Sequence, residues 1–275
     1  MPFGLPDSDQ KLTYGGYLKV RELLELQQRL SEPAQHDETL FIIIHQVYEL
    51  WFKQLLHEVD AIVEYLRNGE VLVAHRMLRR CIEIQRVLVQ QLSVLETMTP
   101  MDFLAFRDHL MPASGFQSAQ FREMEIVSGL RDARALVNYE EGSPERARLE
   151  RRLRAPSLAD ELFGLLDHRG LGSPDRVAAV EKVYRGAHQH YDLFLLCESL
   201  IEYDEMFQLW RMRHVQMVER VIGGGTRGTG GSSGAGYLRS TIDRRFFPEL
   251  WEVRNRLGAG LPQDPAGRAA VGHLD

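Results

Sequence analysis

The chain has 275 residues, of which 44% are hydrophobic and 26% charged, which is the composition of a folded protein and excludes a disordered one. Its formal net charge of −6 gives no electrostatic reason to expect nucleic acid or an anionic membrane surface as a partner. The two cysteines, Cys81 and Cys197, suit a reducing compartment. Because we find neither signal-peptide architecture nor an apolar run of ~20 residues, we expect a cytoplasmic protein without a membrane span.

Nearly every periodic segment has the 3.6-residue period of an amphipathic helix, and none alternates as a strand would. In chain order, we predict helices over residues 16–30, 38–66, 71–98, 100–110, 117–129 and 177–222, with a final short helix that holds Phe246, Phe247, Leu250 and Trp251. Between residues 138 and 175 we expect peripheral helices that start at the cap signals Ser143-Pro144, Ser157 and Ser173-Pro174. The fold class is therefore all-α, a single-domain bundle of long antiparallel helices over residues 1–275.

The chain also contains glycine-rich segments and clusters of charged residues. Residues 223–225 end the long helix, and residues 227–234 could bind an anion through backbone N–H groups and hydroxyls or could be a flexible loop. The tail 259–275 is expected to be frayed. Arginine clusters such as 79–80 and 151–154 are interleaved with acidic residues, which indicates solvated helix faces.

Two histidines lie on apolar helix faces. His214 falls between Trp210 and Met217 on one continuous seam, and His45 shares a face with Phe41. A neutral imidazole that points inward needs a polar partner or a metal. Two readings stay open from the residues alone: core histidines that bond within the protein, which is the commoner case, or a flat iron cofactor with one histidine bound and one free.

Arg107 follows the helix start at Thr99-Pro100 and has Phe103 and Phe106 as neighbours on its face. An arginine among aromatic residues is often a surface residue whose stem covers apolar groups. It is also the side chain that can hold a carboxylate with two parallel hydrogen bonds. The sequence alone favours the surface reading.

Six motifs, in this order, resemble the tryptophan 2,3-dioxygenase family. They are Leu12-Thr13-Tyr14-Gly15-Gly16-Tyr17-Leu18, Phe41-Ile42-Ile43-Ile44-His45-Gln46, Phe106-Arg107-Asp108, Pro112-Ala113-Ser114-Gly115-Phe116-Gln117-Ser118, Trp210-Arg211-Met212-Arg213-His214 and residues 227–234. The resemblance runs from about Leu12 to Arg256 and is weakest between residues 138 and 177.

The resemblance implies a homotetramer, a dimer of dimers, with one haem b and its iron in each subunit. It implies an oxidoreductase that inserts both atoms of O2 across the indole C2–C3 bond of L-tryptophan to give N-formyl-L-kynurenine, the first step of the kynurenine pathway. The alternative is a related haem oxygenase that acts on a substituted indole or another aromatic amino acid. A non-catalytic haem sensor and a helical scaffold are the rivals from other classes.

The resemblance also implies the roles of individual residues. His214 is the axial ligand of the haem iron, and Trp210 and Ser114 lie against the haem. His45 is the catalytic residue that hydrogen-bonds the indole N–H, and Arg107 with Thr229 holds the amino-acid head group. The remaining substrate-binding residues are Phe41, Ile42, Ile43, Ile44 and Phe103, with Tyr14, Tyr17 and Leu18 from the N-terminal arm (1–20) of a neighbouring subunit.

Overall fold

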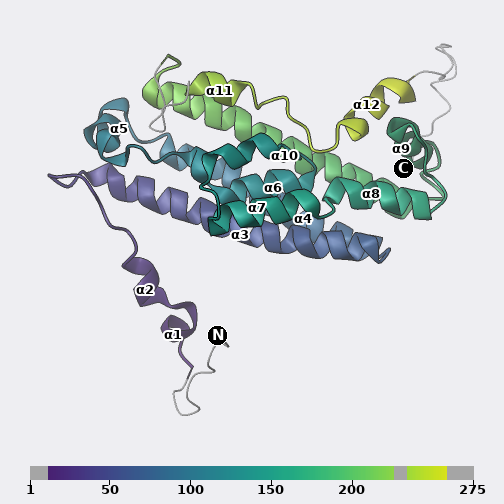
Figure 1. Ribbon diagram of the computed structural model, residues 1–275, viewed down its shortest axis with the longest axis horizontal. Helices are drawn as coiled ribbons and strands as arrows, with labels where there is room; N and C mark the ends of the chain where they lie inside the picture. Colours follow the sequence, from purple (N-terminus) through teal and green to yellow (C-terminus); the bar gives the residue numbers. More distant parts are fainter. Residues whose placement is uncertain (1–11, 226–233, 259–275) are drawn as a thin grey trace, which may run out of the picture.

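A computed structural model describes residues 12–225 and 234–258, and every regular element in that part of the chain is a helix (Figure 1). This confirms the predicted all-α fold class. The long helices are α3 (His36–Arg67), α4 (Val71–Leu95) and α10 (Tyr191–Ile222). The shorter α-helices are α1 (Tyr14–Leu18), α2 (Val20–Leu24), α5 (Pro100–Arg107), α6 (Ala119–Ser128), α7 (Pro144–Arg154), α8 (Leu158–His168), α9 (Arg176–Arg185), α11 (Ala235–Arg239) and α12 (Pro248–Leu257). Single 3-10 turns are η1 (Asp108–Leu110), η2 (Gly115–Gln117) and η3 (Ala133–Asn138).

The three long helices form the centre of the molecule. A turn of three residues joins α3 to α4, and Gly69 takes a φ of 77° there, so the two helices run back along each other as predicted. The inward face of α3 is fully buried at Leu55, Val59 and Ile62. Helix α10 packs along α4, while α6 and α8 pack against α3 (Figure 1). One apolar core joins these elements from α3 to α12.

Helix starts follow the predicted cap signals in most cases. The Thr99 hydroxyl accepts a hydrogen bond from the backbone of Asp102, whose carboxylate accepts in return, and this capping box starts α5. Ser143 caps α7 and Ser157 caps α8 in the same way that the sequence predicts. The predicted cap at Ser173-Pro174 is wrong. Asp175 instead accepts from the Val177 N–H at 3.0 Å and starts α9.

The predicted single helix over residues 177–222 is two helices, α9 and α10, with a turn at residues 186–190 between them. The backbone at Gly186 comes so close to neighbouring atoms that a Cβ there would lie 3.0 Å from the Lys182 carbonyl oxygen. The turn lets α9 leave the line of α10 and pack against α12, a contact between segments about 70 residues apart. Periodicity alone cannot report such a contact, because both helices are amphipathic.

Both ends of the described chain also differ from the prediction. The predicted helix over residues 16–30 is two single turns, α1 and α2, which meet at Lys19 with a φ of 55°. Neither turn buries a residue, and both project away from the bundle (Figure 1). Isolated helices of this length are marginal without packing. Near the other end, Phe246 and Phe247 precede α12 instead of belonging to it, and the short helix α11 was not predicted.

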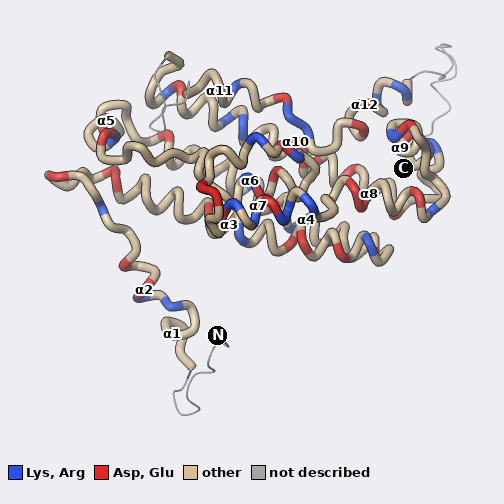
Figure 2. The backbone as a smooth tube through the Cα atoms, viewed as in Figure 1, with Lys and Arg blue, Asp and Glu red and all other residues tan. Residues whose placement is uncertain are grey.

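Charged residues of both signs are mixed along the helices (Figure 2). The prediction of a solvated face is wrong for Arg152 of α7, whose side chain is only 22% exposed. This guanidinium pairs with Asp60 of α3 and Glu123 of α6 and so ties three helices together. Among the described helices, none combines the length with the low charge that crossing a bilayer requires.

Candidate functional site

An interior cavity of about 280 Å³ lies between α3, α4, α5, α6, α10 and α11. Aliphatic side chains from α4 and α10 form part of its wall, among them Leu92, Leu95 and Met217. The aromatic rings in the wall are Phe41, Tyr48, Phe52, Phe103, Phe116, Phe121, Trp210 and Tyr237. Such a wall suits flat apolar groups, and the few polar side chains in it would set their orientation.

The cavity brings together half of the residues that the sequence predicts for the site. Those in its wall are Phe41, His45, Phe103, Arg107, Ser114, Trp210 and His214. Ile42, Ile43 and Ile44 lie on α3 but outside the wall, and Ile44 is buried in the core. Tyr14, Tyr17 and Leu18 are exposed on α1, away from the bundle in this single chain (Figure 1). Thr229 lies outside the described residues.

His45 stands on α3 with its ring open to the cavity, 4.1 Å from the ring of Phe41. Its Nδ1 lies 2.7 Å from the carbonyl oxygen of Phe41. A carbonyl only accepts, so Nδ1 donates, and the neutral ring presents Nε2 to the cavity as an acceptor. Surrounding protein lowers the pKa of His45 by desolvation, against smaller opposing effects from the Phe41 carbonyl and the Glu49 carboxylate. The ring is therefore neutral near pH 7.

His214 lies one turn after Trp210 on α10, and the two rings stack with centroids 5.0 Å apart and planes 14° apart. Burial lowers the pKa of His214 to about 4, and the nearby His45 adds a smaller effect in the same direction. The imidazole is therefore neutral at physiological pH, and its nitrogen lone pair is available to a metal.

Arg107 ends α5, and the capping box at Thr99 fixes the start of that short helix. The side chain lies in the cavity wall and is half-buried. Phe103 and Phe106 of the same helix pack edge to face 5.4 Å apart, and Phe41 lies 5.8 Å from Phe103. A guanidinium is thus presented to the cavity beside an aromatic wall. This overturns the surface reading that the sequence alone favours.

The chain matches the family model described as tryptophan 2,3-dioxygenase over residues 4–162 and 164–257. It belongs to the tryptophan 2,3-dioxygenase family. A protein named tryptophan 2,3-dioxygenase from Nocardioides sp. is 48% identical over 255 residues, which cover 90% of this chain and 95% of that protein. Proteins of the same name from Myxococcus xanthus and Xanthomonas euvesicatoria are 42% identical; the alignments cover 94% and 97% of this chain and 94% and 95% of those proteins.

The tryptophan 2,3-dioxygenase family is haem-dependent, and the cavity fits such a cofactor. Its wall offers aromatic and aliphatic surface for a flat macrocycle, and neutral His214 supplies one nitrogen ligand for iron. No Cys-x-x-Cys-His motif is present for covalent attachment, so ligation and burial would hold the haem. Within the described residues, no group of three or more His, Cys, Asp or Glu side chains is placed to hold a metal ion.

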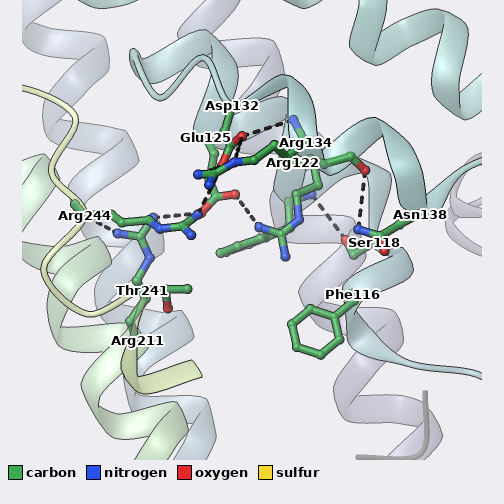
Figure 3. Close-up of polar contacts among 12 residues, drawn as sticks. Phe116, Ser118, Arg122, Glu125, Asp132, Arg134, Asn138, Arg211, Thr241 and Arg244 are labelled. Atoms are coloured by element: carbon green, nitrogen blue, oxygen red, sulfur yellow. Dashed lines mark hydrogen bonds and ion pairs between the residues drawn. The ribbon is translucent and has the colours of Figure 1, made fainter. Parts of the chain in front are cut away.

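A charged cluster that the sequence did not lead us to expect lies in the wall of the same cavity (Figure 3). Arg122 and Glu125 come from α6, and Arg211 comes from α10, three residues before His214. All three are buried. The available signal was weak: a charged pair at i,i+3 in α6, a segment that also contains Gln120 and Glu123, and exposed helices use that spacing as well.

Proposed function

We propose that this chain catalyses the reaction for which its family is named. It inserts both atoms of O2 across the indole C2–C3 bond of L-tryptophan and yields N-formyl-L-kynurenine, the first step of tryptophan catabolism by the kynurenine pathway. The family match over nearly the whole chain supports the activity. The single structural observation that supports it most directly is the cavity in which His45, Arg107 and His214 meet among aromatic rings.

A haem b in each subunit would be held by His214, with Trp210 stacked against the ligand ring and Ser114 in the wall nearby. The neutral state of the imidazole supports this role, because a protonated ring cannot bind iron. When bound, haem supplies the iron that binds and activates O2. The protein supplies position and exclusion of water.

His45 would orient the indole ring. With Nδ1 committed to the Phe41 carbonyl, Nε2 is free to accept a hydrogen bond from the indole N–H. The tautomer is fixed by a main-chain atom of the same helix, so the acceptor is in place before the substrate enters. We assign His45 this orienting role and predict that the lowered pKa keeps it neutral.

Phe41 and Phe103 would form the walls around the indole, and Arg107 would hold the substrate carboxylate with two parallel hydrogen bonds. Thr229 would contact the same head group. Placing the reacting ring in this way lowers the entropic part of the barrier. Buried Ile44 would support this wall from the core, whereas Ile42 and Ile43 lie outside the wall on α3 and Ile43 is exposed.

A homotetramer, a dimer of dimers, is part of the proposal. The single chain leaves α1 with exposed Tyr14, Tyr17 and Leu18 that bury nothing against their own bundle. In an oligomer these side chains would complete the substrate pocket of a neighbouring subunit. Each subunit would be one haem-binding domain over residues 1–275, which the main apolar core from α3 to α12 supports.

The test is turnover by the purified, haem-loaded chain with L-tryptophan and ¹⁸O2. We expect N-formyl-L-kynurenine, followed by its absorbance, with two labelled oxygen atoms by mass spectrometry. Turnover of a substituted indole or another aromatic amino acid but not of tryptophan would support the alternative substrate. A Soret band without tryptophan-dependent O2 consumption would indicate a haem sensor. No Soret band in a fully supplemented preparation would remove the haem proposal.

A further inference from the structure

The charged cluster in the cavity wall carries more positive than negative charge. Glu125 accepts from the Arg122 guanidinium through one carboxylate oxygen and from Arg211 Nη2 at 2.9 Å through the other (Figure 3). Arg211 Nη1 donates to the backbone carbonyl of Arg244 at 2.6 Å. Arg122, Glu125 and Arg211 are 7%, 6% and 3% exposed, so two buried cations are hydrogen-bonded to one buried carboxylate.

A buried excess charge is unfavourable unless another anion compensates it. The Arg211 guanidinium has a donor to spare: its Nε is buried, and among the described residues no acceptor bonds to it. Burial lowers the pKa of Arg211, against the attraction of Glu125 and the smaller attraction of Asp204, whose own carboxylate already accepts from Phe246, Phe247 and Trp251. Glu49, the other carboxylate in the cavity wall, accepts from the Gln120 amide at 2.7 Å and, within the described chain, pairs with neither arginine. The charge of the cluster and the Nε of Arg211, unpaired among the residues that the structure describes, therefore favour one further negative group, which a ligand would supply.

The cluster lies apart from Arg107, the residue proposed to bind the substrate carboxylate. Arg107 belongs to α5 near one end of the bundle, whereas α6 lies beside its middle (Figure 1). Arg122 lies 5.4 Å from the centroid of the Phe121 ring, and that ring lies 5.2 Å from Trp210. Arg211 is on the same helix as His214, three residues earlier. The cluster thus adjoins the ring stack at the proposed iron ligand.

We propose that Arg122 and Arg211, bridged by Glu125, bind a propionate carboxylate at the edge of the haem. This inference rests on the haem cofactor of the proposed function. Glu125 holds the two guanidiniums in place, so the pair meets the carboxylate already oriented. Arg211 would then act on the cofactor twice through α10, once at its edge and once by fixing the helix that carries His214.

The proposal predicts that the chain binds a haem with ionised propionates more tightly than a haem whose propionates are neutral. Free haem carries ionised propionates, and haem dimethyl ester carries none. Charge-assisted hydrogen bonds to a buried pair should make the wild-type chain bind haem on the order of 10- to 100-fold more tightly than the diester. Arg122→Gln and Arg211→Gln should each reduce that preference, because one donor group and one positive charge are removed while the apolar walls stay unchanged.

The experiment titrates full-length apoprotein with haem and, separately, with haem dimethyl ester, and follows the Soret band and the quenching of tryptophan fluorescence. Arg134→Gln is the matched control. Arg134 lies in the same region (Figure 3), but its side chain is 85% exposed, pairs with Asp132 and does not line the cavity. We expect the control to keep the wild-type ratio of the two dissociation constants and the two test variants to approach a ratio of one.

Two results would overturn the inference: a wild-type chain that binds both cofactors equally, or test variants that keep the full preference. A raised KM for tryptophan with an unchanged ratio would move the cluster to the substrate. Failure of the wild-type chain to bind either cofactor would instead refute the haem proposal itself. If a variant does not fold by circular dichroism, the wild-type comparison of haem with its diester still decides.

Discussion

Replacing Arg107 with alanine tests the proposed grip on the amino-acid head group. Removing one partner of a buried, hydrogen-bonded charge pair costs about 2–5 kcal/mol. Arg107 is half-buried at the end of α5, so water would screen part of the interaction. We therefore expect the lower part of that range, about 2–3 kcal/mol, which is on the order of 30- to 150-fold in kcat/KM for tryptophan. Arg107→Lys keeps the charge but loses the parallel pair of donors, so its kcat/KM for tryptophan should lie between those of the wild type and Arg107→Ala.

The assay follows product formation at several concentrations of L-tryptophan and, in parallel, of tryptamine, which has the same indole and amine but no carboxylate. Haem content is matched between preparations by the Soret absorbance. Wild type and Arg107→Ala should differ strongly with tryptophan and little with tryptamine. If both substrates lose the same factor, Arg107 supports the shape of α5 and does not bind the carboxylate, and the reasoning from the cavity wall fails.

Three further outcomes are expected. His214→Ala should lose haem, seen as the absence of the Soret band after reconstitution, and an unchanged spectrum would contradict ligation. The pKa of His45 is lowered below its ordinary value of 6.5, so the neutral ring that accepts a hydrogen bond persists until the pH falls below the lowered pKa. The acid limb of the pH profile of kcat/KM should therefore lie below pH 6.5 and should disappear in His45→Ala. That variant should retain haem and turn over slowly. Asp204→Ala should destabilise the fold by about 3–5 kcal/mol in urea unfolding, because the backbone N–H groups of Phe246 and Phe247 and the Trp251 indole N–H lose their acceptor. The exposed Asp243→Ala, as control, should change stability by less than about 0.5 kcal/mol.

The central helices could be predicted because their sequences carry their own periodicity and end signals. The sequence predicts a helix over residues 38–66, and α3 spans residues 36–67; the predicted capping box at Thr99 is present. The turn at residues 186–190 could not be predicted, since the packing of α9 on α12 decides it. The N-terminal helix was overpredicted for a related reason: its apolar residues have no core to pack against in one chain.

Some residues of the site could likewise be predicted from the sequence, and others could not. From residues alone, His45 and His214 could not be distinguished from core histidines, and only the motif order identified them. The cavity adds that both rings face one space and that desolvation by the surrounding protein lowers the pKa of each. Arg122 and Arg211 were missed because a charged residue in an amphipathic helix is ordinarily read as exposed. Their burial depends on Glu125 reaching both guanidiniums, a contact across 86 residues between α6 and α10.

Arg107 and the pair Arg122 and Arg211 lie in one cavity wall, and the elements that hold them suit two different ligands. Arg107 stands at the end of α5, a helix of eight residues whose start is fixed by the Thr99 capping box and which contacts α3 and α10. Arg211 is tied to α6 through Glu125 and to the segment before α12 through the Arg244 carbonyl, so it can move only with the bundle. A cofactor that stays bound through every turnover suits the arginine that is tied to two other segments, and a substrate that enters and leaves suits the arginine at the end of the short helix. Variants at the two places should therefore differ in effect. Changes at Arg107 should weaken tryptophan binding while haem is retained, whereas changes at Arg211 should weaken haem binding before they affect tryptophan binding.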